Sequence, residues 1–377
     1  MKLKHLFLIA LLFITGMVSA QQMGPIPVNK NVRQGKLSNG LTYYILHNDW
    51  PEHVANFYIA QRVGSIQENE NQRGLAHFLE HMAFNGSEHF PDSTLLEFTR
   101  SLGVEFGSNL NAYTSIDQTV YRVCDVPTTR QTALDSCLLI LKDWSNGLTL
   151  ADKEIDKERG VIHQEWQLGQ SAQMRILDKV LPEFYPNSKY GKRLPIGLME
   201  IVDKFPYQAL RDYYKKWYRP DNQCIIVVGD VDVDHIENQI KQLWNGVVVP
   251  ANAAQVVAEP VPDNAQALYI FGKDKELPYS DVALYMKHDA FPDEAKTDQS
   301  YFIDSYAKRI ISMMLNQRLA ELAQKPDCPF TGAYAGDGTY MLSRTKDAFS
   351  MEANAKDGKD LETLAALYRE AQRVHQH

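Results

Sequence analysis

The stretch Arg73–Gly86 (RGLAHFLEHMAFNG) limits the possible folds of this chain more than any other part of the sequence. If it forms a helix, His77 and His81 lie one turn apart on the same face, and Glu80 shares that face. Apolar side chains fill the remaining surface and would anchor the helix in a core, and the Asn-Gly pair at its end provides a left-handed stop. Two imidazoles and a carboxylate that converge on one point are the groups that a hydrolytic zinc site requires.

The order His-x-x-Glu-His reverses the commoner zincin motif and is the inverzincin signature. In such a site the two histidines bind zinc, and the glutamate acts as the base for the metal-bound water. The alternative is a surface helix that carries two histidines and an acid by chance. A zinc site of this kind needs a third protein ligand, which must lie elsewhere in the chain.

The composition is that of a globular protein with room for about two domains, since 377 residues with 44% hydrophobic content can bury substantial cores. The net charge of −8 and the lack of a basic tract argue against a nucleic-acid partner. No cysteine belongs to a C-x-x-C pair, which removes the usual zinc-thiolate and redox interpretations. Buried free thiols are expected instead, at Cys124, Cys137, Cys224 and Cys328.

Residues 1–20 have the pattern of a secretory signal peptide. Lys2 and Lys4 give a basic start, residues 6–14 are an unbroken apolar run, and Val18-Ser19-Ala20 provides a small-residue cleavage site. The apolar run is too short for a convincing membrane span, and no cysteine follows the cut. The sequence therefore predicts an exported, soluble mature chain in the periplasm or outside the cell, without a stable membrane anchor.

The hydrophobic patterns predict an α+β protein made of two homologous units. In the first unit, residues 30–247, a sheet packs with helices that include the histidine motif. Strands are expected at 41–47, 55–63, 110–115, 119–124 and 223–228, and further helices at 91–102, 129–144, 151–177 and 234–244. Residues 248–263, rich in alanine, valine and proline, are interpreted as a linker.

Residues 264–377 repeat the order of elements of the first unit. Strands are expected at 267–273, 282–288, 332–334 and 349–353, and helices at 301–324 and 359–377. This second unit has no His-x-x-Glu-His motif and is expected to be non-catalytic. Its last helix corresponds to the one at 129–144, after which the first unit still adds a long helix and a core strand. The expectation is therefore an incomplete second unit from a truncated reading frame.

Glu158 and Glu165 are candidates for the third ligand. Their spacing on a helix is only about 20° short of two full turns, so both carboxylates point the same way. One could bind a metal while the other holds a ligand histidine or a bound water. The alternative is that both belong to a solvated charged stripe, and the spacing alone leaves the two interpretations open.

Three blocks of sequence together resemble the pitrilysin/insulinase family of metallopeptidases, which includes the mitochondrial processing peptidases. They are Gly74–Gly86, the pair Leu110–Ser115 and Thr119–Tyr121, and Glu158–Glu165, in this order. The resemblance extends over residues 30–377. It implies two homologous units, each a mixed or antiparallel sheet packed with helices.

The resemblance implies that one Zn²⁺ per chain is bound by His77, His81 and Glu165. Glu80 is then the general base, and Glu158 supports Glu165. The separation from His81 to Glu165, 165 − 81 = 84 positions, is longer than usual in the family. Counting the usual separation literally reaches a position near Glu158, whereas alignment of the blocks favours Glu165.

The resemblance further implies that a peptide or unfolded protein binds as an added strand along Asn111, Ala112 and Tyr113. The alternative for these residues is a plain edge-strand turn with Tyr113 as a core aromatic. The expected function is zinc-dependent endoproteolysis of extended peptides, completed by a missing C-terminal half in cis or a partner subunit in trans. The rival expectation is a non-catalytic partner or scaffold subunit of the same family.

Overall fold

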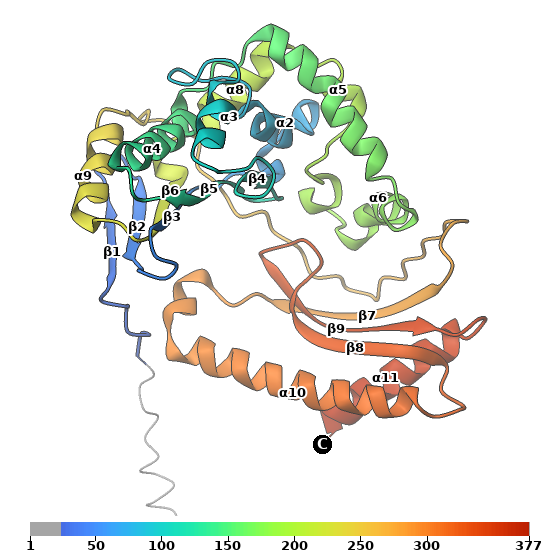
Figure 1. Ribbon diagram of the computed structural model, residues 1–377. Helices are drawn as coiled ribbons and strands as arrows, with labels where there is room; N and C mark the ends of the chain where they lie inside the picture. Colours follow the sequence, from blue (N-terminus) through green and yellow to red (C-terminus); the bar gives the residue numbers. More distant parts are fainter. Residues whose placement is uncertain (1–23, 377) are drawn as a thin grey trace, which may run out of the picture. The chain divides into compact units, whose positions relative to one another are not determined.

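The computed structural model describes residues 24–376, so the predicted signal peptide at 1–20 lies outside the described residues (Figure 1). The chain forms two compact units. The larger unit is Asn29–Leu277, and the smaller unit is Pro278–His377 together with the segment up to Val28. Within residues 24–376, no helix combines the length and apolar character that crossing a membrane requires.

A mixed six-stranded sheet organises the larger unit, in the order β1-β2-β6-β3-β5-β4. Strands β2 and β6 run parallel and the other neighbours run antiparallel. Along β3 and β6 fully buried residues alternate with partly exposed ones, as expected for a sheet with one face on the core. The strands are β1 (Val32–Lys36), β2 (Thr42–His47), β3 (Val54–Gln61), β4 (Leu110–Thr114), β5 (Thr119–Pro127) and β6 (Gln223–Gly229).

Helices pack on this sheet and share its hydrophobic core. Helix α4 contacts β3 and β5, α9 contacts β2, and the motif helix α2 contacts β4, α5 and α8. The largest fully buried side chains of the core include Trp144 and Trp244. The helices are α2 (Leu75–Met82), α3 (Thr94–Ser101), α4 (Gln131–Asn146), α5 (Asp152–Leu168), α6 (Ala172–Phe184), α7 (Met199–Val202), α8 (Tyr207–Trp217) and α9 (Val233–Trp244).

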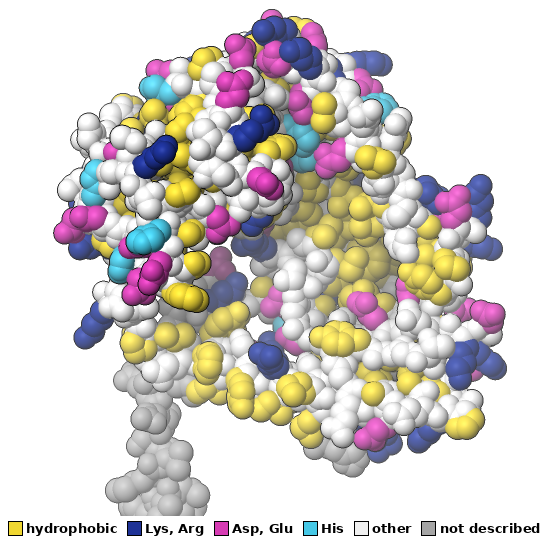
Figure 2. Space-filling view, viewed as in Figure 1, with side chains coloured by type: hydrophobic (Ala, Val, Ile, Leu, Met, Phe, Trp, Pro, Cys, Tyr) yellow, Lys and Arg dark blue, Asp and Glu magenta, His cyan; other side chains and the backbone are white. Residues whose placement is uncertain are grey.

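The smaller unit contains an antiparallel sheet in the order β7-β9-β8, with helices α10 and α11. Its pairing repeats that of β3, β5 and β4, with a helix after the last strand in both units, and this confirms the predicted duplication. Many apolar side chains of α10 are exposed, and Figure 2 shows apolar side chains at the surface over this helix. The elements are β7 (Ser280–Asp289), α10 (Gln299–Ala323), β8 (Phe330–Thr339), β9 (Lys346–Ala355) and α11 (Asp360–Gln376).

The predicted strand at 267–273 is wrong. Residues 247–279 contain no helix or strand, although 267–273 has the apolar and aromatic composition of a strand. The segment is instead held against α6: a Cβ on Gly272 would lie 2.3 Å from Ile176, and the Arg175 guanidinium donates to both oxygens of Asp274 at 2.8 Å. A strand needs a pairing partner, and local composition cannot supply one.

The single long helix predicted at 151–177 is also wrong, because the chain breaks into α5 and α6 around Gly169. Ser171 caps the second helix by accepting a hydrogen bond from the Met174 backbone N–H at 3.2 Å. The motif helix ends at Met82, and Gly86 then adopts a φ of +105° in the following turn. Strand β1 lies outside every segment for which a strand was expected.

Candidate metal centre and active site

Helix α2 presents its two histidines and Glu80 from a core-anchored backbone. Phe78, Leu79 and Met82 are fully buried, and the Phe78 ring stacks edge-on against Phe205 with centroids 4.8 Å apart. The side chain of His77 is 11% exposed and that of His81 is 22% exposed. The two histidine side chains therefore lie just below the surface, where water reaches them only in part.

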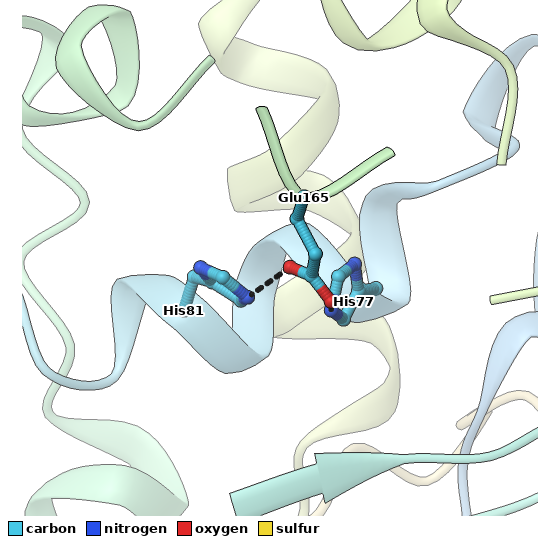
Figure 3. Close-up of side chains that lie close together, drawn as sticks. All are labelled: His77, His81 and Glu165. Atoms are coloured by element: carbon cyan, nitrogen blue, oxygen red, sulfur yellow. Dashed lines mark ion pairs between the residues drawn. The ribbon is translucent and has the colours of Figure 1, made fainter. Parts of the chain in front are cut away.

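Glu165 from α5 reaches both histidines (Figure 3). Its Oε1 lies 3.5 Å from His77 Nε2 and its Oε2 lies 3.3 Å from His81 Nε2. One ligand atom from each residue lies within 4.8 Å of the other two. Two imidazole nitrogens and a carboxylate at this spacing fit the donor set that Zn²⁺ prefers, with a position left for water.

Glu158 contacts His81 at Nδ1, the ring nitrogen that does not face Glu165. Its Oε1 is 2.8 Å from His81 Nδ1, and its Oε2 accepts a hydrogen bond from the Asn85 side chain at 2.7 Å. A carboxylate on the far nitrogen of a histidine fixes the orientation and tautomer of the ring. Among residues 24–376, His77 has no such partner, because its Nδ1 is buried without a hydrogen bond.

The surroundings shift the pKa values of the two histidines in opposite directions. Burial, reinforced by the nearby charge of His81, lowers the pKa of His77 to about 4. Burial also disfavours charged His81, but its hydrogen bonds to Glu158 and Glu165 outweigh this and raise its pKa to about 9. The hydrogen bond with His81 lowers the pKa of Glu165. Since histidine binds metals in its neutral form, a metal at His81 Nε2 replaces a proton there.

Glu80 belongs to α2, and its side chain contacts the edge strand β4. Its Oε2 accepts a hydrogen bond from the Thr114 hydroxyl at 2.8 Å, and burial raises the pKa of its carboxyl group. Glu80 directly precedes His81 in α2, close to the cluster of His77, His81 and Glu165, and the charge of His81 lowers this pKa while that of Glu165 raises it. A buried carboxylate with a raised pKa is suited to take up and release a proton.

The segment Asn111–Tyr113 lies on β4, which is the last strand of the sheet. The Ala112 N–H donates to Asn111 Oδ1 at 2.8 Å, and Asn111 Nδ2 donates to the Gly107 carbonyl at 2.8 Å. Tyr113 is 50% exposed, so the alternative that it is a core aromatic is wrong. An edge strand with exposed side chains is able to accept an added strand.

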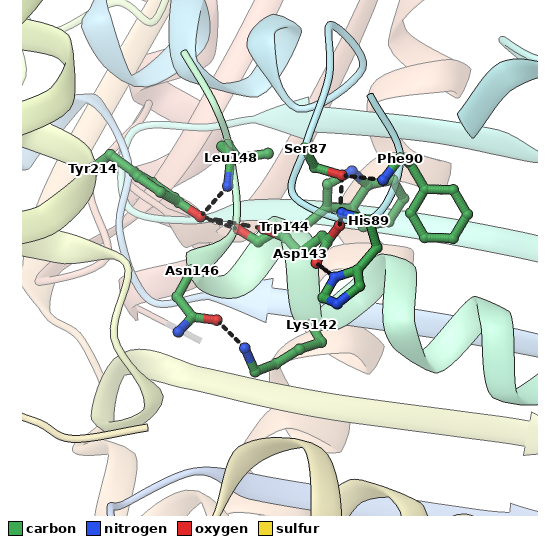
Figure 4. Close-up of polar contacts among 9 residues, drawn as sticks. All are labelled: Ser87, His89, Phe90, Lys142, Asp143, Trp144, Asn146, Leu148 and Tyr214. Atoms are coloured by element: carbon green, nitrogen blue, oxygen red, sulfur yellow. Dashed lines mark hydrogen bonds and ion pairs between the residues drawn. The ribbon is translucent and has the colours of Figure 1, made fainter. Parts of the chain in front are cut away.

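Sequence reasoning missed the anchor at the C-terminal end of α2, and Figure 4 shows the part of it that Asp143 forms with Ser87 and His89. Trp144 Nε1 donates to the Ala83 carbonyl at 2.9 Å. The neighbouring Asp143 carboxylate accepts bonds from the Ser87 hydroxyl at 2.6 Å and the His89 backbone N–H at 2.9 Å, and it pairs with His89 Nδ1 at 2.7 Å. An acid inside the apolar run of α4 was the available signal, because a fully buried carboxylate requires donors.

Two family models together match most of the chain. Residues 43–195 match "Insulinase (Peptidase family M16)", and residues 204–371 match "Peptidase M16 inactive domain". "Probable zinc protease PqqL" of Escherichia coli (strain K12) is 33% identical over 373 residues, which cover 99% of this chain and 39% of that protein. The chloroplastic stromal processing peptidase of Arabidopsis thaliana is 32% identical over 211 residues, covering 55% of this chain and 16% of that protein.

Solved structures agree with these matches. The crystal structure of the first half of the periplasmic protease PqqL from Escherichia coli superposes with a TM-score of 0.79 at 32% identity, covering 92% of this chain and 73% of that one. The chain thus spans about two fifths of the whole PqqL sequence, 39%. The α+β architecture, the repeated units and both family matches lead to one conclusion: the chain belongs to the insulinase family of peptidases, family M16.

Proposed function

We propose that this chain carries the catalytic centre of a zinc-dependent endopeptidase that cleaves extended peptides. His77, His81 and Glu165 hold one Zn²⁺, and Glu80 is the general base. The observation that carries the proposal is that both Nε2 atoms face the two oxygens of one carboxylate, Glu165, at 3.5 and 3.3 Å. The family match and the similarity to a probable zinc protease support it.

The residues of the proposed site have different roles in catalysis. His77, His81 and Glu165 would hold the zinc, which when bound would act as a Lewis acid towards a water molecule and the scissile carbonyl. Glu80 accepts the proton of the attacking water and passes it to the leaving nitrogen, while Glu158 keeps the His81 ring in place. The peptide lies along Asn111–Tyr113 as an added strand, held by main-chain hydrogen bonds that permit many sequences.

The test separates metal binding from proton transfer. In Glu80→Gln, zinc content should stay at one per chain, while peptide hydrolysis falls by about 10²–10⁴-fold, the usual contribution of a general base. His81→Ala, the matched variant one position away, should lose the zinc as well as the activity. Full hydrolysis by Glu80→Gln, or a wild-type chain that binds no zinc, would overturn the proposal.

The rival function is a non-catalytic partner or scaffold subunit. It fits the match of residues 204–371 to an inactive domain, but the complete His-x-x-Glu-His motif and its contacts with Glu165 favour catalysis. A zinc-free chain that still binds an M16 partner would favour the rival.

We also propose that the chain is exported and works with a second half. The similar PqqL of Escherichia coli is described as periplasmic, and residues 1–20 have the signal-peptide pattern. The remaining part of PqqL has no counterpart among these 377 residues. A further half, in cis or in trans, is proposed to close over the substrate and stabilise the developing oxyanion.

A further inference from the structure

Helix α2 is too short to hold its own position. It has 8 residues, and isolated helices of that length are unstable in water. The first N–H groups of any helix also lack partners within the helix. The place of the two histidines therefore depends on the packing of α2 in the core and on what fixes its ends.

The N-cap of α2 cannot supply the usual side-chain acceptor. The N-cap residue is Gly74, whose φ of +107° disfavours any other residue. Gly197 packs so closely on it that an added Cβ on Gly197 would lie 2.3 Å from the Gly74 Cα. An acceptor for the N–H groups of the first turn must come from another segment.

Glu68 provides that acceptor from the preceding loop. Its side chain is fully buried, with Oε2 accepting from the Gly74 N–H at 3.1 Å and Oε1 accepting from the Ala76 N–H at 2.8 Å. Arg193, itself 2% exposed, donates from Nε to the Glu68 backbone carbonyl at 3.2 Å. The Ser65 hydroxyl in turn donates to the Arg193 carbonyl at 2.5 Å, so the anchor belongs to a buried, connected network.

The two histidines depend on this anchor to different degrees. The His81 ring is oriented by Glu158, whereas His77 Nδ1 is buried without a hydrogen-bond partner in the described part of the chain. No described residue holds His77 Nδ1 by a hydrogen bond, so the position of the ring depends on the backbone of α2 and on its contacts with the His81 ring and Glu165. Ala76, whose N–H is bound by Glu68, is the residue immediately before His77.

We propose that Glu68 is a positioning residue of the metal centre, which fixes the N-terminal turn of α2 and thereby holds His77 Nε2 opposite Glu165. Glu68 does for His77, through the backbone, what Glu158 does for His81 through the ring. This inference rests on the proposed zinc site. It adds a residue that acts on metal affinity without touching the metal.

The test uses the whole chain and Zn²⁺ as the probe. Glu68→Met keeps the size of the side chain and removes both acceptors. Zinc affinity, measured by competition with a chelator well below the melting temperature, should weaken at least about tenfold, as for other residues that hold metal ligands in place. The absorption bands of the cobalt-substituted protein should change, and kcat should fall with little change in KM, because the peptide-binding edge is untouched. Glu70→Met is the matched control: Glu70 pairs with the same Arg193 from an exposed position and should leave all three readouts unchanged.

Two outcomes would overturn the inference. The first is a folded Glu68→Met protein with wild-type zinc affinity and cobalt spectrum. The second is a lower melting temperature with unchanged affinity, which would make Glu68 a structural cap only. If Glu68→Met does not fold, Glu68→Asp decides, because it keeps the carboxyl group but shortens the reach to the Ala76 N–H. Zinc affinity equal to wild type in Glu68→Asp would then count against the inference. A wild-type chain without zinc would instead refute the proposed function.

Discussion

At the scale of single residues, two glutamates on one helix face have different surroundings. Glu165 meets the Nε2 atoms of both histidines and its side chain is 49% exposed, whereas Glu158 contacts Nδ1 of His81 and is 12% exposed. A metal ligand needs an open side for substrate, and a supporting carboxylate needs a fixed environment. These contacts support the proposal that Glu165 is the ligand and that Glu158 holds a ligand histidine in place.

Substitution of each glutamate should have a different effect on zinc. Glu165→Gln is expected to abolish stable zinc binding, because it removes a charged ligand. Glu158→Gln should retain one zinc per chain with affinity lowered by about 10–100-fold, the usual cost of losing a residue that orients a ligand. Metal analysis after dialysis and chelator competition measure both. Retained zinc in Glu165→Gln together with loss in Glu158→Gln would exchange the two roles.

A second residue-scale prediction concerns pH and Glu68. Burial raises the pKa of Glu68 to about 8, despite its two backbone hydrogen bonds and the charges of Arg193 and Arg73, which lower it. The folded chain then binds this proton more tightly than the unfolded chain. The contribution of Glu68 to the free energy of unfolding is therefore largest below about pH 4.5 and decreases up to about pH 8.

Urea unfolding at a series of pH values measures this effect. Between about pH 5 and about pH 8, the free energy of unfolding of wild type should fall relative to that of Glu68→Met, and the difference should level off above about pH 8. Parallel curves for the two proteins across this range would mean that Glu68 has an ordinary pKa in the folded state.

At the scale of secondary-structure elements, the site depends on the meeting of a buried helix and an exposed strand edge. Helix α2 contacts β4, and Thr114 of β4 donates to Glu80 of α2. The C-terminal end of α2 is held by Trp144 and, through the following loop, by Asp143. The proposed base and the proposed peptide-binding edge are thus joined by a direct hydrogen bond.

The edge of β4 can be tested through one backbone N–H. Ala112→Pro removes the N–H that now donates to Asn111 Oδ1, and proline is tolerated on an edge strand where the N–H faces solvent. KM for an extended peptide should rise about 2–10-fold, the effect of one hydrogen bond worth ~0.5–1.5 kcal/mol. Zinc affinity should not change. Ala112→Gly, which keeps the N–H, is the control, and equal KM values for the two variants would argue against strand addition at this position.

At the scale of the whole molecule, the two units differ in how well their apolar residues are buried. The core of the larger unit draws on its sheet and most of its helices, whereas the described residues of the smaller unit form a small core cluster around Leu319, Met351 and Leu367. On α10, Phe302 is 65% exposed and Met314 is 68% exposed. Exposed apolar surface of this extent is a liability for a unit on its own and predicts a lower local stability.

Limited proteolysis should reveal this difference. Trypsin is expected to remove the smaller unit and leave a resistant fragment near Asn29–Leu277 that retains its zinc. Arg175→Gln should move the downstream boundary towards residue 247, because Arg175 anchors Asp274 and Glu276 to α6. Mass spectrometry of the fragments gives both boundaries. Equal resistance of the two units, or survival of the smaller unit alone, would contradict the expectation.

The sequence by itself determined the motif helix, the duplication and most strands, because these follow from periodicity within short segments. Residues one turn apart share a helix face whatever the rest of the chain does, so His77 and His81 could be paired from spacing. Spacing alone left Glu165 and Glu158 equivalent, since both point the same way from α5, and the different contacts of the two carboxylates come from where that helix meets α2. The tertiary structure also left residues 267–273 without strand pairing and placed Glu68 at Ala76, because partners distant in sequence are decided by packing.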